Sequence, residues 1–500
     1  MQDKERFKED IEKKLIEIGI GLVAIKDWNL LLKKIVQEAI SITNADGGTL
    51  YLSKGSYLEH EIMQNKSLGI DKGANDEVIQ FAPLSICMSN IAAYSALKQE
   101  VINIENVYDS DLFDFSGPRE FDHDTGYRTK SMLVFPLINR RSTVVGVLQL
   151  VNALDEHDNV VPFDERIEHV VLSIASQAAI AIENMQYMQE VRNLFESFVK
   201  VIAKAIDERT PYNSQHSENL SVHIQSFARY LTSCDKGPYK DKSFSEEDLY
   251  ELKTAAWLHD IGKIVVPIET LDKSSRLADK FTPLMSRYDL IIAKLHWHYY
   301  KDKAKKEPSI TASEEANFHK NLAYVEATRT FITLVNDSST YVDKAITEQL
   351  NNVYQHKIEG IDEPFLTDDE LEHLSIVRGT LTAKERKEIE GHVTSGARIL
   401  SKMQFPDYLQ HIYEWINHHH EYLDGSGYPN KLTEEHIPLE SRMMTILDIY
   451  DALVERNRPY KKAIPKAKAL EIIRNMAAEN KLDTDLVNAF IDSRIWDSYL

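Results

Sequence analysis

The sequence predicts a multidomain protein in which an α/β domain comes first, a linker helix follows, and an all-α domain forms the C-terminal half. Three observations lead to this prediction. The chain has 500 residues, whereas one domain commonly has about 150. Strand-like runs bounded by turn residues are concentrated before residue 165, and helical periodicity dominates after residue 202.

The expected elements of the first half follow one another as two helices, a strand, a helix and two strands. The strands are rich in β-branched residues and begin after glycine or turn segments. In chain order we expect helices at about Lys4–Ile16 and Leu30–Thr43, a strand at Gly47–Leu52, a mostly helical stretch at Leu84–Leu97, and strands at Ser131–Leu137 and Val144–Ala153.

Between the halves, apolar residues recur at alternating intervals of three and four, which is the spacing of a heptad seam. They are Met188, Val191, Phe195, Phe198, Ile202 and Ala205. A single helix packed on its own domain would have this pattern, as would a parallel dimer helix that joins two domains. We favour the dimer helix and therefore expect a homodimer, with domains at 1–187 and 207–500 and a linker helix at 188–206.

The composition is that of an acidic globular protein. Lys and Arg number 58 and Asp and Glu number 79, which gives a formal net charge of −21. So acidic a surface repels a phosphate backbone, and a nucleic-acid polymer is not expected as a partner. The hydrophobic fraction of 43% and the charged fraction of 27% also exclude a disordered chain.

Cysteine usage and the apolar segments predict a cytoplasmic protein that has no contact with a membrane. The two cysteines, Cys87 and Cys234, are far apart and have no metal-type spacing, which suits a reducing compartment. The N-terminus MQDKERFKED is charged throughout, unlike a signal peptide. The longest uncharged apolar stretch, Val170–Ile182, would span only about 20 Å as a helix.

Three segments of the first half resemble a GAF domain of the type found in cyclic-nucleotide phosphodiesterases and bacterial signalling proteins. They are GYRTKSMLVFPL (Gly126–Leu137), GVLQLVNA (Gly146–Ala153) and PFDE (Pro162–Glu165). The resemblance implies a central antiparallel sheet with helices and a pocket for a small regulatory molecule. The cyclic-nucleotide signature is incomplete, since Ala153 follows Asn152 and Phe163 directly precedes Asp164. The ligand is therefore left open.

Histidines, carboxylates and cations of the second half fall in five short segments. Imidazole and carboxylate ligands together suit Fe, Mn or Zn better than Mg. Two such ions about 4 Å apart clamp a phosphoryl group and supply a hydroxide. Adjacent residues of a helix project about 100° apart, so we expect His259 and Asp260 not to crowd one side of one ion, whereas the carboxylate can bridge two ions. The segments contribute His216; His259, Asp260 and Lys263; His392; His419, His420 and Tyr428; and Asp448, Asp451, Arg458 and Lys461.

The motifs HDIGK, HHEYLDGSGYP and RPYK resemble the HD-GYP family, whose members hydrolyse cyclic di-GMP. The resemblance implies hydrolysis to pGpG, with onward hydrolysis to GMP left open, and GGDEF-type signalling proteins as candidate partners. It implies two divalent ions, iron or manganese. One would be held by His216, His259, Asp260 and Asp448, and the other by Asp260, His392, His419 and His420. Asp260 and Lys263 would be catalytic, and Lys263, Tyr428, Arg458 and Lys461 would bind the substrate.

Two further features depart from or qualify the family pattern. Residues 274–377 form a predicted helical insertion that would shield the site or contact a partner, and its histidines (His296, His298, His319 and His373) are expected to be solvated or in the core. Tyr212 stands four residues before His216, where members with three metals have a glutamate, and Glu208 could reach the site only if the loop after it folds back. A two-metal centre is therefore expected. Glu421 and Asp424 are expected to order their loop through hydrogen bonds.

Two other functions remain open from the sequence alone. One is a catalytically weak HD-GYP protein that binds cyclic di-GMP or a partner protein. The other is a phosphohydrolase that acts on another cyclic dinucleotide or on a nucleotide. The intact HDIGK and Gly-Tyr-Pro motifs favour the cyclic di-GMP phosphodiesterase.

Overall fold

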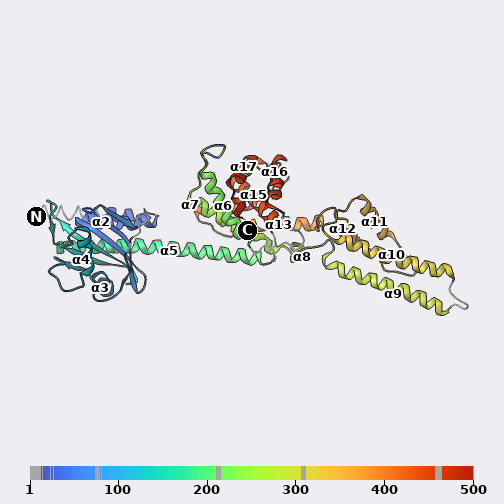
Figure 1. Ribbon diagram of the computed structural model, residues 1–500, viewed down its shortest axis with the longest axis horizontal. Helices are drawn as coiled ribbons and strands as arrows, with labels where there is room; N and C mark the ends of the chain where they lie inside the picture. The colour runs from blue at the N-terminus through green and yellow to red at the C-terminus, as the bar shows by residue number, and fades with distance from the viewer. Residues whose placement is uncertain are drawn as a thin grey trace. The chain divides into compact units, whose positions relative to one another are not determined.

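The computed structural model describes residues 13, 15–22, 24–25, 27–73, 79, 81–209, 215–305, 311–455 and 464–498. The chain forms two compact units, Met1–Leu194 and Phe195–Leu500. The first contains the sheet and the second is helical (Figure 1). The multidomain α/β and all-α organisation is thereby confirmed. None of the described helices is both long enough and apolar enough to cross a membrane.

The first unit is built on one antiparallel sheet with the strand order β3-β2-β1-β7-β6-β5. Two short strands lie off this path, because β4 pairs with β2 and β8 pairs with β7. The strands are β1 (Ala45–Ser53), β2 (Tyr57–Asn65), β3 (Ile70–Gly73), β4 (Leu84–Ser85), β5 (Ile102–Ile104), β6 (Met132–Ile138), β7 (Val144–Leu154) and β8 (Val160–Val161). The central antiparallel sheet implied by the GAF resemblance is confirmed.

Both faces of this sheet are buried, and different helices cover them. Successive strand residues point to opposite faces. Leu50, Phe135 and Leu148 accordingly share a core with α2 (Trp28–Thr43) and the first half of α5 (Glu168–Asp207). Their neighbours, including Tyr51 and Val147, share a second core with α3 (Ile91–Lys98) on the other face. A further helix, α4, spans Ser116–Thr125.

Most predicted elements of this unit are confirmed, and one is partly wrong. Asp27 caps α2 by accepting a hydrogen bond from the Leu30 amide at 2.7 Å. The stretch predicted as helical from Leu84 begins instead as β4, and the helix starts only at Ile91. The reason is Asn90, whose side chain accepts hydrogen bonds from the next turn and so sets the helix start there. The predicted first helix lies largely outside the described residues.

Helix α5 contains the whole segment predicted as a linker helix. Its apolar residues Met188, Val191 and Phe198 are 67%, 66% and 59% exposed. By contrast, Phe195 and Ile202 pack against the core of the second unit. The predicted seam therefore consists of an exposed row (Met188, Val191 and Phe198) and of residues that pack within their own chain (Phe195 and Ile202).

The described part of the second unit contains helices, turns and one isolated β-bridge, between Asp424 and Thr433. Several helices begin with capping boxes, such as Ser245 with Asp248 and Thr382 with Glu385. The main helices are α6 (His216–Thr232), α7 (Glu246–Leu258), α8 (Ile268–Leu271), α13 (Ala383–Leu400), α14 (Ile412–His418), α15 (Leu439–Val454), α16 (Lys466–Ala478) and α17 (Thr484–Ser493).

One hydrophobic core holds six of these helices together. Each of α6, α7, α14, α15, α16 and α17 contributes fully buried side chains to it. They include Phe227, Leu252, Ile416, Ile446, Ile473 and Phe490. Because α6, α7, α14 and α15 carry or flank the predicted metal ligands, this core positions the site.

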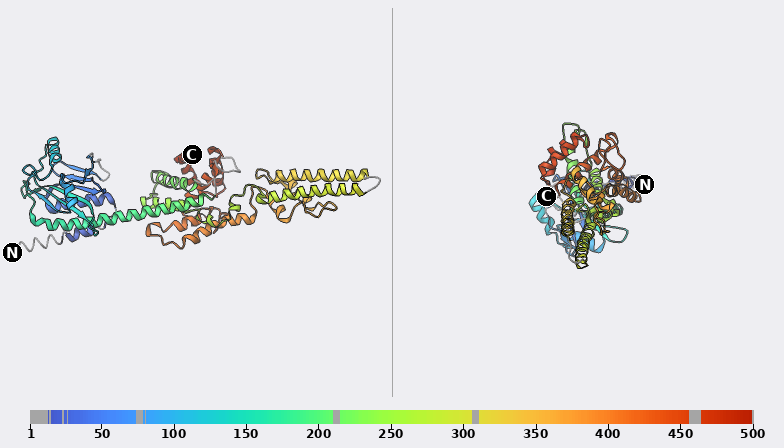
Figure 2. Two further views of the ribbon diagram at one scale, coloured as in Figure 1. Left: turned by 90° about the horizontal axis from the view of Figure 1, so that it is seen from below. Right: turned by 90° about the vertical axis from the view of Figure 1, so that its right-hand side faces the viewer.

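The predicted insertion is helical and has a core of its own. It contains α9 (Phe281–Lys305), α10 (Ala312–Asn336), α11 (Lys344–Gln355) and α12 (Asp368–Leu374). Figures 1 and 2 show α9 and α10 side by side. Among its predicted non-ligand histidines, His373 is buried and its Nδ1 faces the carbonyl oxygen of Asp369 at 2.6 Å, as expected for a core residue.

Arg276 closes the base of the insertion. Its side chain is fully buried and donates hydrogen bonds to the carbonyl oxygens of Val335, Thr340 and Ile376 at 2.7, 2.6 and 2.9 Å. A buried guanidinium is stable only when its donors are satisfied. Arg276 and Ile376 lie at opposite ends of the insertion, so this hydrogen bond holds the two ends of the insertion together.

Candidate metal centre

His216 is the first residue of α6, and its two ring nitrogens have different surroundings. Its Nδ1 makes a very short contact with a carboxylate oxygen of Asp451 on α15. Its Nε2 lies 3.2 Å from Nε2 of His259 and 3.2 Å from Oδ1 of Asp448. A carboxylate behind one nitrogen orients the ring and leaves the other nitrogen directed at the site.

His259 and Asp260 lie where α7 ends, which overturns one expectation. His259 is the C-cap, and Asp260 has left the helix with φ −96° and ψ 8°. The two side chains therefore converge, with Nε2 of His259 at 3.1 Å from Oδ2 of Asp260. The expectation that they cannot crowd one side of one ion was wrong, because it assumed regular helical geometry for both residues.

Gly262 of the HDIGK motif brings this turn against α13. The turn is the 3-10 segment Ile261–Val265. A Cβ on Gly262 would lie 1.8 Å from the carbonyl oxygen of His392 and 2.5 Å from the amide nitrogen of Gly396, so no side chain fits there. The close backbone approach places Oδ1 of Asp260 at 3.4 Å from Nε2 of His392. Glycine at this position therefore joins the two halves of the site.

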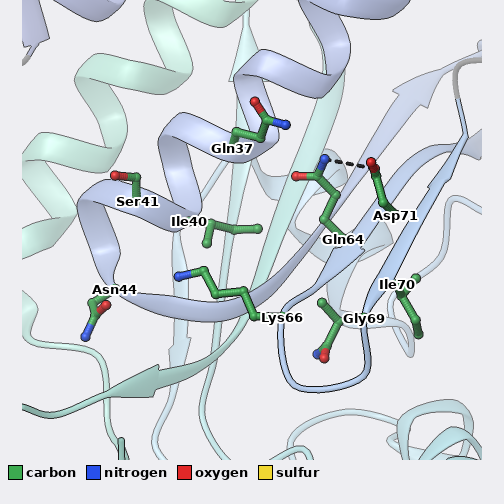
Figure 3. Close-up of a pocket in the computed structure, with 10 residues that line it drawn as sticks. Gln37, Ile40, Ser41, Asn44, Gln64, Lys66, Gly69, Ile70 and Asp71 are labelled. Atoms are coloured by element: carbon green, nitrogen blue, oxygen red, sulfur yellow. Dashed lines mark hydrogen bonds between the residues drawn. The ribbon is translucent and has the colours of Figure 1, made fainter.

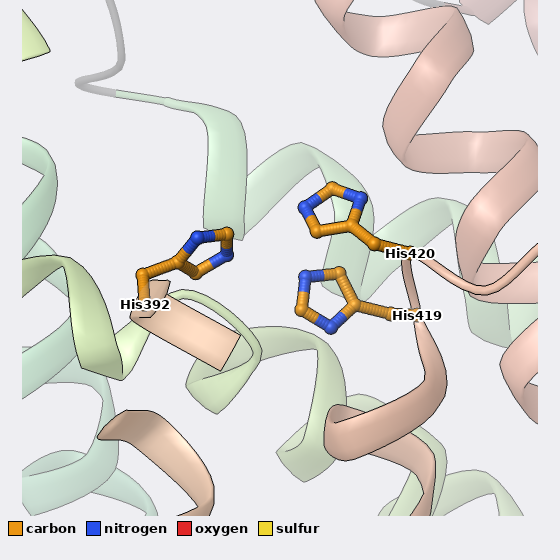
Figure 4. Close-up of side chains that lie close together, drawn as sticks. All are labelled: His392, His419 and His420. Carbon is orange, nitrogen blue, oxygen red and sulfur yellow. The ribbon is translucent and has the colours of Figure 1, made fainter. Parts of the chain in front are cut away.

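Three further histidines form a second group. His392 comes from α13, and His419 and His420 directly follow α14 (Figure 4). The ring centroids of His392 lie 5.7 Å from His419 and 5.3 Å from His420. The ligand atoms of this group lie within 4.8 Å of one another, and the same holds for the group of His216, His259 and Asp260.

Hydrogen bonds to the backbone orient three of the imidazole rings. In each case Nδ1 faces the carbonyl oxygen three residues earlier: Ala256 for His259 at 2.7 Å, Ile389 for His392 at 2.6 Å and Ile416 for His419 at 2.5 Å. Since a carbonyl only accepts hydrogen bonds, Nδ1 carries the proton and Nε2 keeps its lone pair. All three Nε2 atoms are therefore suited to bind a metal ion.

Several atoms that point into the site are buried and have no hydrogen-bond partner among the described residues. They are Oδ1 of Asp260 and Nε2 of His392 and His419. Buried polar atoms in native proteins are nearly always paired, and an ion is one of the partners that explains an exception. The donor set of imidazoles and carboxylates thus fits a pair of borderline transition-metal ions.

Asp260 and Asp448 both lie between the two groups. Oδ2 of Asp260 faces His216 and His259, whereas its Oδ1 faces His392. Oδ1 of Asp448 faces His216, and its Oδ2 lies 3.8 Å from Nδ1 of His420. The bridging position expected for Asp260 therefore has a geometric counterpart in Asp448, which the sequence assigned to one group alone.

Burial and nearby charges shift the pKa values of the histidines in opposite directions in the two groups. Burial alone would lower the pKa of His216, but hydrogen bonds with Asp448 and Asp451 outweigh it and raise that pKa well above its usual value. In the second group burial lowers the pKa of His392, and it lowers the pKa of His420 to about 3. The histidines of the second group are therefore neutral and able to act as ligands at pH 7.

The predicted substrate residues are only partly within the described structure. Nζ of Lys263 lies 2.5 Å from Oδ2 of Asp260, and the Tyr428 ring centroid lies 4.8 Å from that of His420. Burial raises the pKa of the Tyr428 phenol well above its usual value, so it stays protonated and can donate a hydrogen bond. Arg458 and Lys461 lie outside the described residues, as does Tyr212.

Glu421 and Asp424 hold the loop that carries Tyr428, as expected. The two carboxylate oxygens of Glu421 accept hydrogen bonds from the amides of Asn430 and Leu432, at 2.6 and 2.9 Å. Oδ1 of Asp424 accepts a hydrogen bond from the amide of Ser426 at 2.9 Å. These contacts confirm that both acids order the loop.

Asp451 was singled out in the sequence without a role, and Asp207 was not among the candidate residues. Asp451 lies three residues after Asp448 on α15, and this helical spacing was an available signal. Asp207 ends α5, and its Oδ1 accepts a hydrogen bond from the Ser217 hydroxyl at 3.1 Å, directly beside His216. No spacing pattern reveals Asp207, because its contact depends on how the chain turns between α5 and α6.

A cavity of about 400 Å³ opens beside the second group, and we name it the α13 pocket. It is lined by Leu381, Arg386, Ile389, Glu390, His420, Tyr422, Tyr428, Asp448, Ile449, Ala452 and Leu453. Because His420 and Asp448 belong to the metal groups, a molecule in this cavity would reach the centre directly.

Cavities also occur in the described part of the first unit. One, of about 620 Å³, lies between α2 and the β2–β3 turn, where Gln64 donates a hydrogen bond to Asp71 at 3.0 Å (Figure 3). Another, of about 340 Å³, is lined by side chains of the sheet and by several aromatic rings, including Tyr51, His60 and Phe81. We name the latter the sheet pocket.

Comparisons with known families match two regions of the chain. The model of the GAF domain matches residues 27–182, and that of the HD domain matches residues 368–486. The second match begins after the insertion, so His216, His259 and Asp260 lie outside it although the structure places them beside His392.

Two kinds of curated relative are similar to parts of the chain. A cyclic di-GMP phosphodiesterase of Thermotoga maritima is 37% identical over 123 residues, which are 24% of this chain and 33% of the relative. A cGMP-specific 3′,5′-cyclic phosphodiesterase of Drosophila melanogaster is 27% identical over 223 residues, which are 42% of this chain and 18% of the relative. The chain thus spans a third or less of the length of these relatives.

Solved structures similar to the chain include GAF domains. The GAF domain of an Acinetobacter phosphoenolpyruvate-protein phosphotransferase matches with a TM-score of 0.28 and 16% identity, over 36% of this chain and 97% of that one. A GAF domain/HD domain protein from Geobacter sulfurreducens matches with a TM-score of 0.25 and 16% identity, over 33% of this chain and 97% of that one.

Proposed function

Since the chain joins a GAF domain to an HD domain, we propose that it is a metal-dependent phosphodiesterase that hydrolyses cyclic di-GMP to pGpG. The observation that carries this proposal is the convergence of two ligand groups on Asp260 and Asp448. The similarity to a cyclic di-GMP phosphodiesterase over 24% of the chain supports the choice of substrate.

Seven side chains would hold the ions. His216 and His259 form one end, His392, His419 and His420 form the other, and Asp260 and Asp448 lie between them. When bound, two divalent ions polarise the phosphoryl oxygens and lower the pKa of water, which provides a nucleophile at pH 7. The many imidazole ligands make iron or manganese our choice of metal.

The side chains around the centre would orient the phosphodiester. Lys263 lies beside Asp260 and compensates negative charge that develops on the phosphoryl oxygens. The Tyr428 ring lies next to that of His420, and its hydroxyl would donate a hydrogen bond to the substrate. Attack of the oxygen of water at phosphorus would form a new P–O bond and break the bond to a ribose 3′-oxygen. A proton released by that water would end on the 3′-oxygen, so the ring opens to the linear dinucleotide with a 5′-phosphate.

Turnover by metal-loaded protein tests this proposal. We expect hydrolysis of cyclic di-GMP in a panel that also contains cyclic GMP and another cyclic dinucleotide, with pGpG identified by product analysis. Asp260→Ala should reduce turnover by at least about a hundredfold, because both ligand groups lose a shared carboxylate. Asp235→Ala, at an exposed loop carboxylate of the same unit, is the matched control and should leave turnover unchanged.

The panel separates this function from the alternatives. Asp260→Ala with more than a tenth of wild-type turnover would reject its assigned role. Preferred hydrolysis of cyclic GMP would favour the activity named for the Drosophila relative. Tight binding of cyclic di-GMP without turnover by fully metal-loaded protein would favour a binding protein.

We further propose that the GAF domain regulates this activity through the sheet pocket. The rings of Tyr51, His60 and Phe81 lie next to one another along the pocket. The His60 centroid is 4.6 Å from that of Tyr51 and 5.3 Å from that of Phe81, so the three rings offer flat surfaces to a planar ligand. Cyclic GMP and cyclic AMP are the first probes. A change in turnover of cyclic di-GMP that Thr49→Trp removes would support the proposal, and unchanged turnover with both probes would contradict cyclic-nucleotide control.

A further inference from the structure

The α13 pocket has two kinds of wall. Ile389, Ile449 and Leu453 provide apolar surface, and Tyr422 and Tyr428 provide aromatic rings with hydroxyl groups. Pockets that bind small molecules combine largely apolar walls with a few placed polar groups. A nucleobase and its ribose would find suitable surfaces here, with the attached phosphate next to His420.

Arg386 is the one Lys or Arg side chain among the described residues that line this pocket. It is exposed on α13, and within the described structure it makes no ion pair and no side-chain hydrogen bond. Other arginines of the same unit are engaged: Arg287 with Glu370, and Arg442 with Asp483. The guanidinium of Arg386 therefore has its donors available for a ligand.

Arg386 lies on the same face of α13 as the metal ligand His392. Arg386, Ile389 and His392 are spaced by three residues and form one ridge of α13. Six residues of helix rise by about 9 Å, and helical side chains lean toward the N-terminus, so the guanidinium of Arg386 is directed away from His392. An anion at Arg386 must therefore be a second one, separate from the group at the metal ligands.

The charges around the pocket also favour anion binding by Arg386. Asp448 and Glu390 line the same pocket, and the chain carries a formal net charge of −21, so an anionic ligand is repelled unless a local cation compensates. Arginine meets this need well, because its planar fork donates two parallel hydrogen bonds to phosphate oxygens.

We propose that Arg386 binds the second phosphodiester of the substrate, the one that is not hydrolysed at the metal centre. This inference rests on the proposed function and adds a determinant of specificity to it. Arg386 is what makes the enzyme prefer a cyclic dinucleotide, with two phosphodiesters, over a substrate with a single phosphodiester. It is not needed for hydrolysis of the bond at the metal ions.

Arg386→Gln tests the assignment with two substrates. For cyclic di-GMP we expect KM to rise by about tenfold or more, since a hydrogen-bonded ion pair is lost, while kcat stays within about threefold. For bis(p-nitrophenyl) phosphate, which has one phosphodiester, kcat/KM should not change. Arg386→Lys should recover part of the loss. Arg398→Gln removes an exposed arginine from the same helix outside the pocket and is the matched control.

Two measurements that do not depend on turnover accompany the kinetics. Metal content of Arg386→Gln should equal that of wild type, which shows that the centre is intact. Calorimetric titration with a non-hydrolysable phosphorothioate analogue of cyclic di-GMP should give a Kd that is higher by about tenfold or more.

The outcomes distinguish this inference from the proposed function. If wild type hydrolyses cyclic di-GMP and Arg386→Gln shows KM and Kd within twofold of wild type, the Arg386 assignment is overturned while the function stands. If wild type hydrolyses bis(p-nitrophenyl) phosphate but neither hydrolyses nor binds the cyclic dinucleotide, the proposed function fails and the assignment fails with it.

Discussion

Asp451 illustrates how one side chain outside the ligand set directs a ligand. It contacts Nδ1 of His216, so Nε2 of this histidine is left facing His259 and Asp448. The other oriented imidazoles use backbone carbonyls for the same purpose. A carboxylate is the stronger acceptor, and it also increases the basicity of the ring.

Asp451→Asn should therefore weaken metal binding in the group of His216. Loss of such a partner typically lowers metal affinity or activity by about 10–100-fold, and we expect a loss in this range. Elemental analysis after dialysis against a weak chelator, together with turnover, measures it. Asp492→Asn, at an exposed carboxylate on α17, should behave as wild type. Full metal content with normal turnover in Asp451→Asn would show that His216 needs no such support.

His60 provides a test of the first unit by pH. Burial lowers its pKa to about 4 in the folded protein, compared with about 6.5 when unfolded. Between these values the unfolded chain binds more protons, so the free energy of unfolding should fall as pH drops from about 6.5 to about 4, by up to about 3 kcal/mol. Denaturant titration of this unit's transition measures the change.

His60→Gln removes the titrating group and should flatten this part of the pH profile. His169→Gln, at an exposed histidine, should keep the wild-type profile. Equal slopes for wild type and His60→Gln between pH 6.5 and 4 would contradict the role of burial at His60.

At the scale of single residues, the motifs indicated which residues lie close together, although the assumption of helical geometry wrongly separated His259 from Asp260. His259 and Asp260, and His419 and His420, are adjacent in sequence and converge in the structure. The sequence could not predict that Asp448 faces both groups of ligands, because this depends on how α15 packs beside the end of α14. Nor could it reveal Arg386, because no motif contains it and only the packed helices create the pocket that it lines.

At the scale of elements, the end of α5 is tied to both parts of the centre. Asp207 holds the start of α6 through Ser217. Two residues later, Arg209 donates hydrogen bonds to the carbonyl oxygens of Lys263 and Val266, in the turn that follows Asp260. One short segment thus supports the helix that begins with His216 and the turn that carries Lys263.

Arg209→Gln should loosen the turn that carries Lys263. We expect kcat to fall by about tenfold, because a small displacement of a charged group weakens its contact with the transition state. Metal content should not change, because the residues of both ligand groups are untouched. Arg229→Gln breaks an exposed ion pair with Glu246 and is the matched control. A fall in metal content equal to the fall in kcat would indicate a wider structural loss.

The elements were predicted with uneven success for a physical reason. Continuous runs of β-branched and aliphatic residues between turns predict β6 and β7, and a helical apolar period predicts α2. The strand β2 was not predicted, because it carries Glu59, Glu61 and Gln64 and has only a few buried side chains. Such a strand is stabilised by pairing with β1 and β3 more than by its own pattern.

At the scale of the whole molecule, the exposed row of α5 remains the basis for a dimer prediction. Met188, Val191 and Phe198 are exposed, whereas Phe195 has a partner in its own chain. The substitution pair Val191→Glu and Phe198→Glu is therefore the informative one, since it leaves Phe195 intact. We expect wild type to be a dimer at micromolar concentration and this variant a monomer, because buried unpaired carboxylates are costly.

Light scattering measures the molar mass in solution. Gln186→Glu with Asn193→Glu adds the same charge to α5 away from the apolar row and should leave the dimer intact. A monomeric wild type at micromolar concentration would refute the dimer and would point to some other partner for the exposed row.

Arg276 has a consequence for the way the molecule folds. The ligands His216 and His259 precede the insertion and His392 follows it, so the centre joins distant parts of the chain. Closing a long flexible loop costs conformational entropy before any contact forms. Arg276 bonds to Ile376 and so closes the insertion upon itself. Once the insertion has folded, the chain segments before and after it are held close together. The contacts between His259 and His392 then span a much shorter flexible loop, which lowers the effective contact order for folding of the metal centre. The insertion should therefore fold first, and the metal ions should bind last.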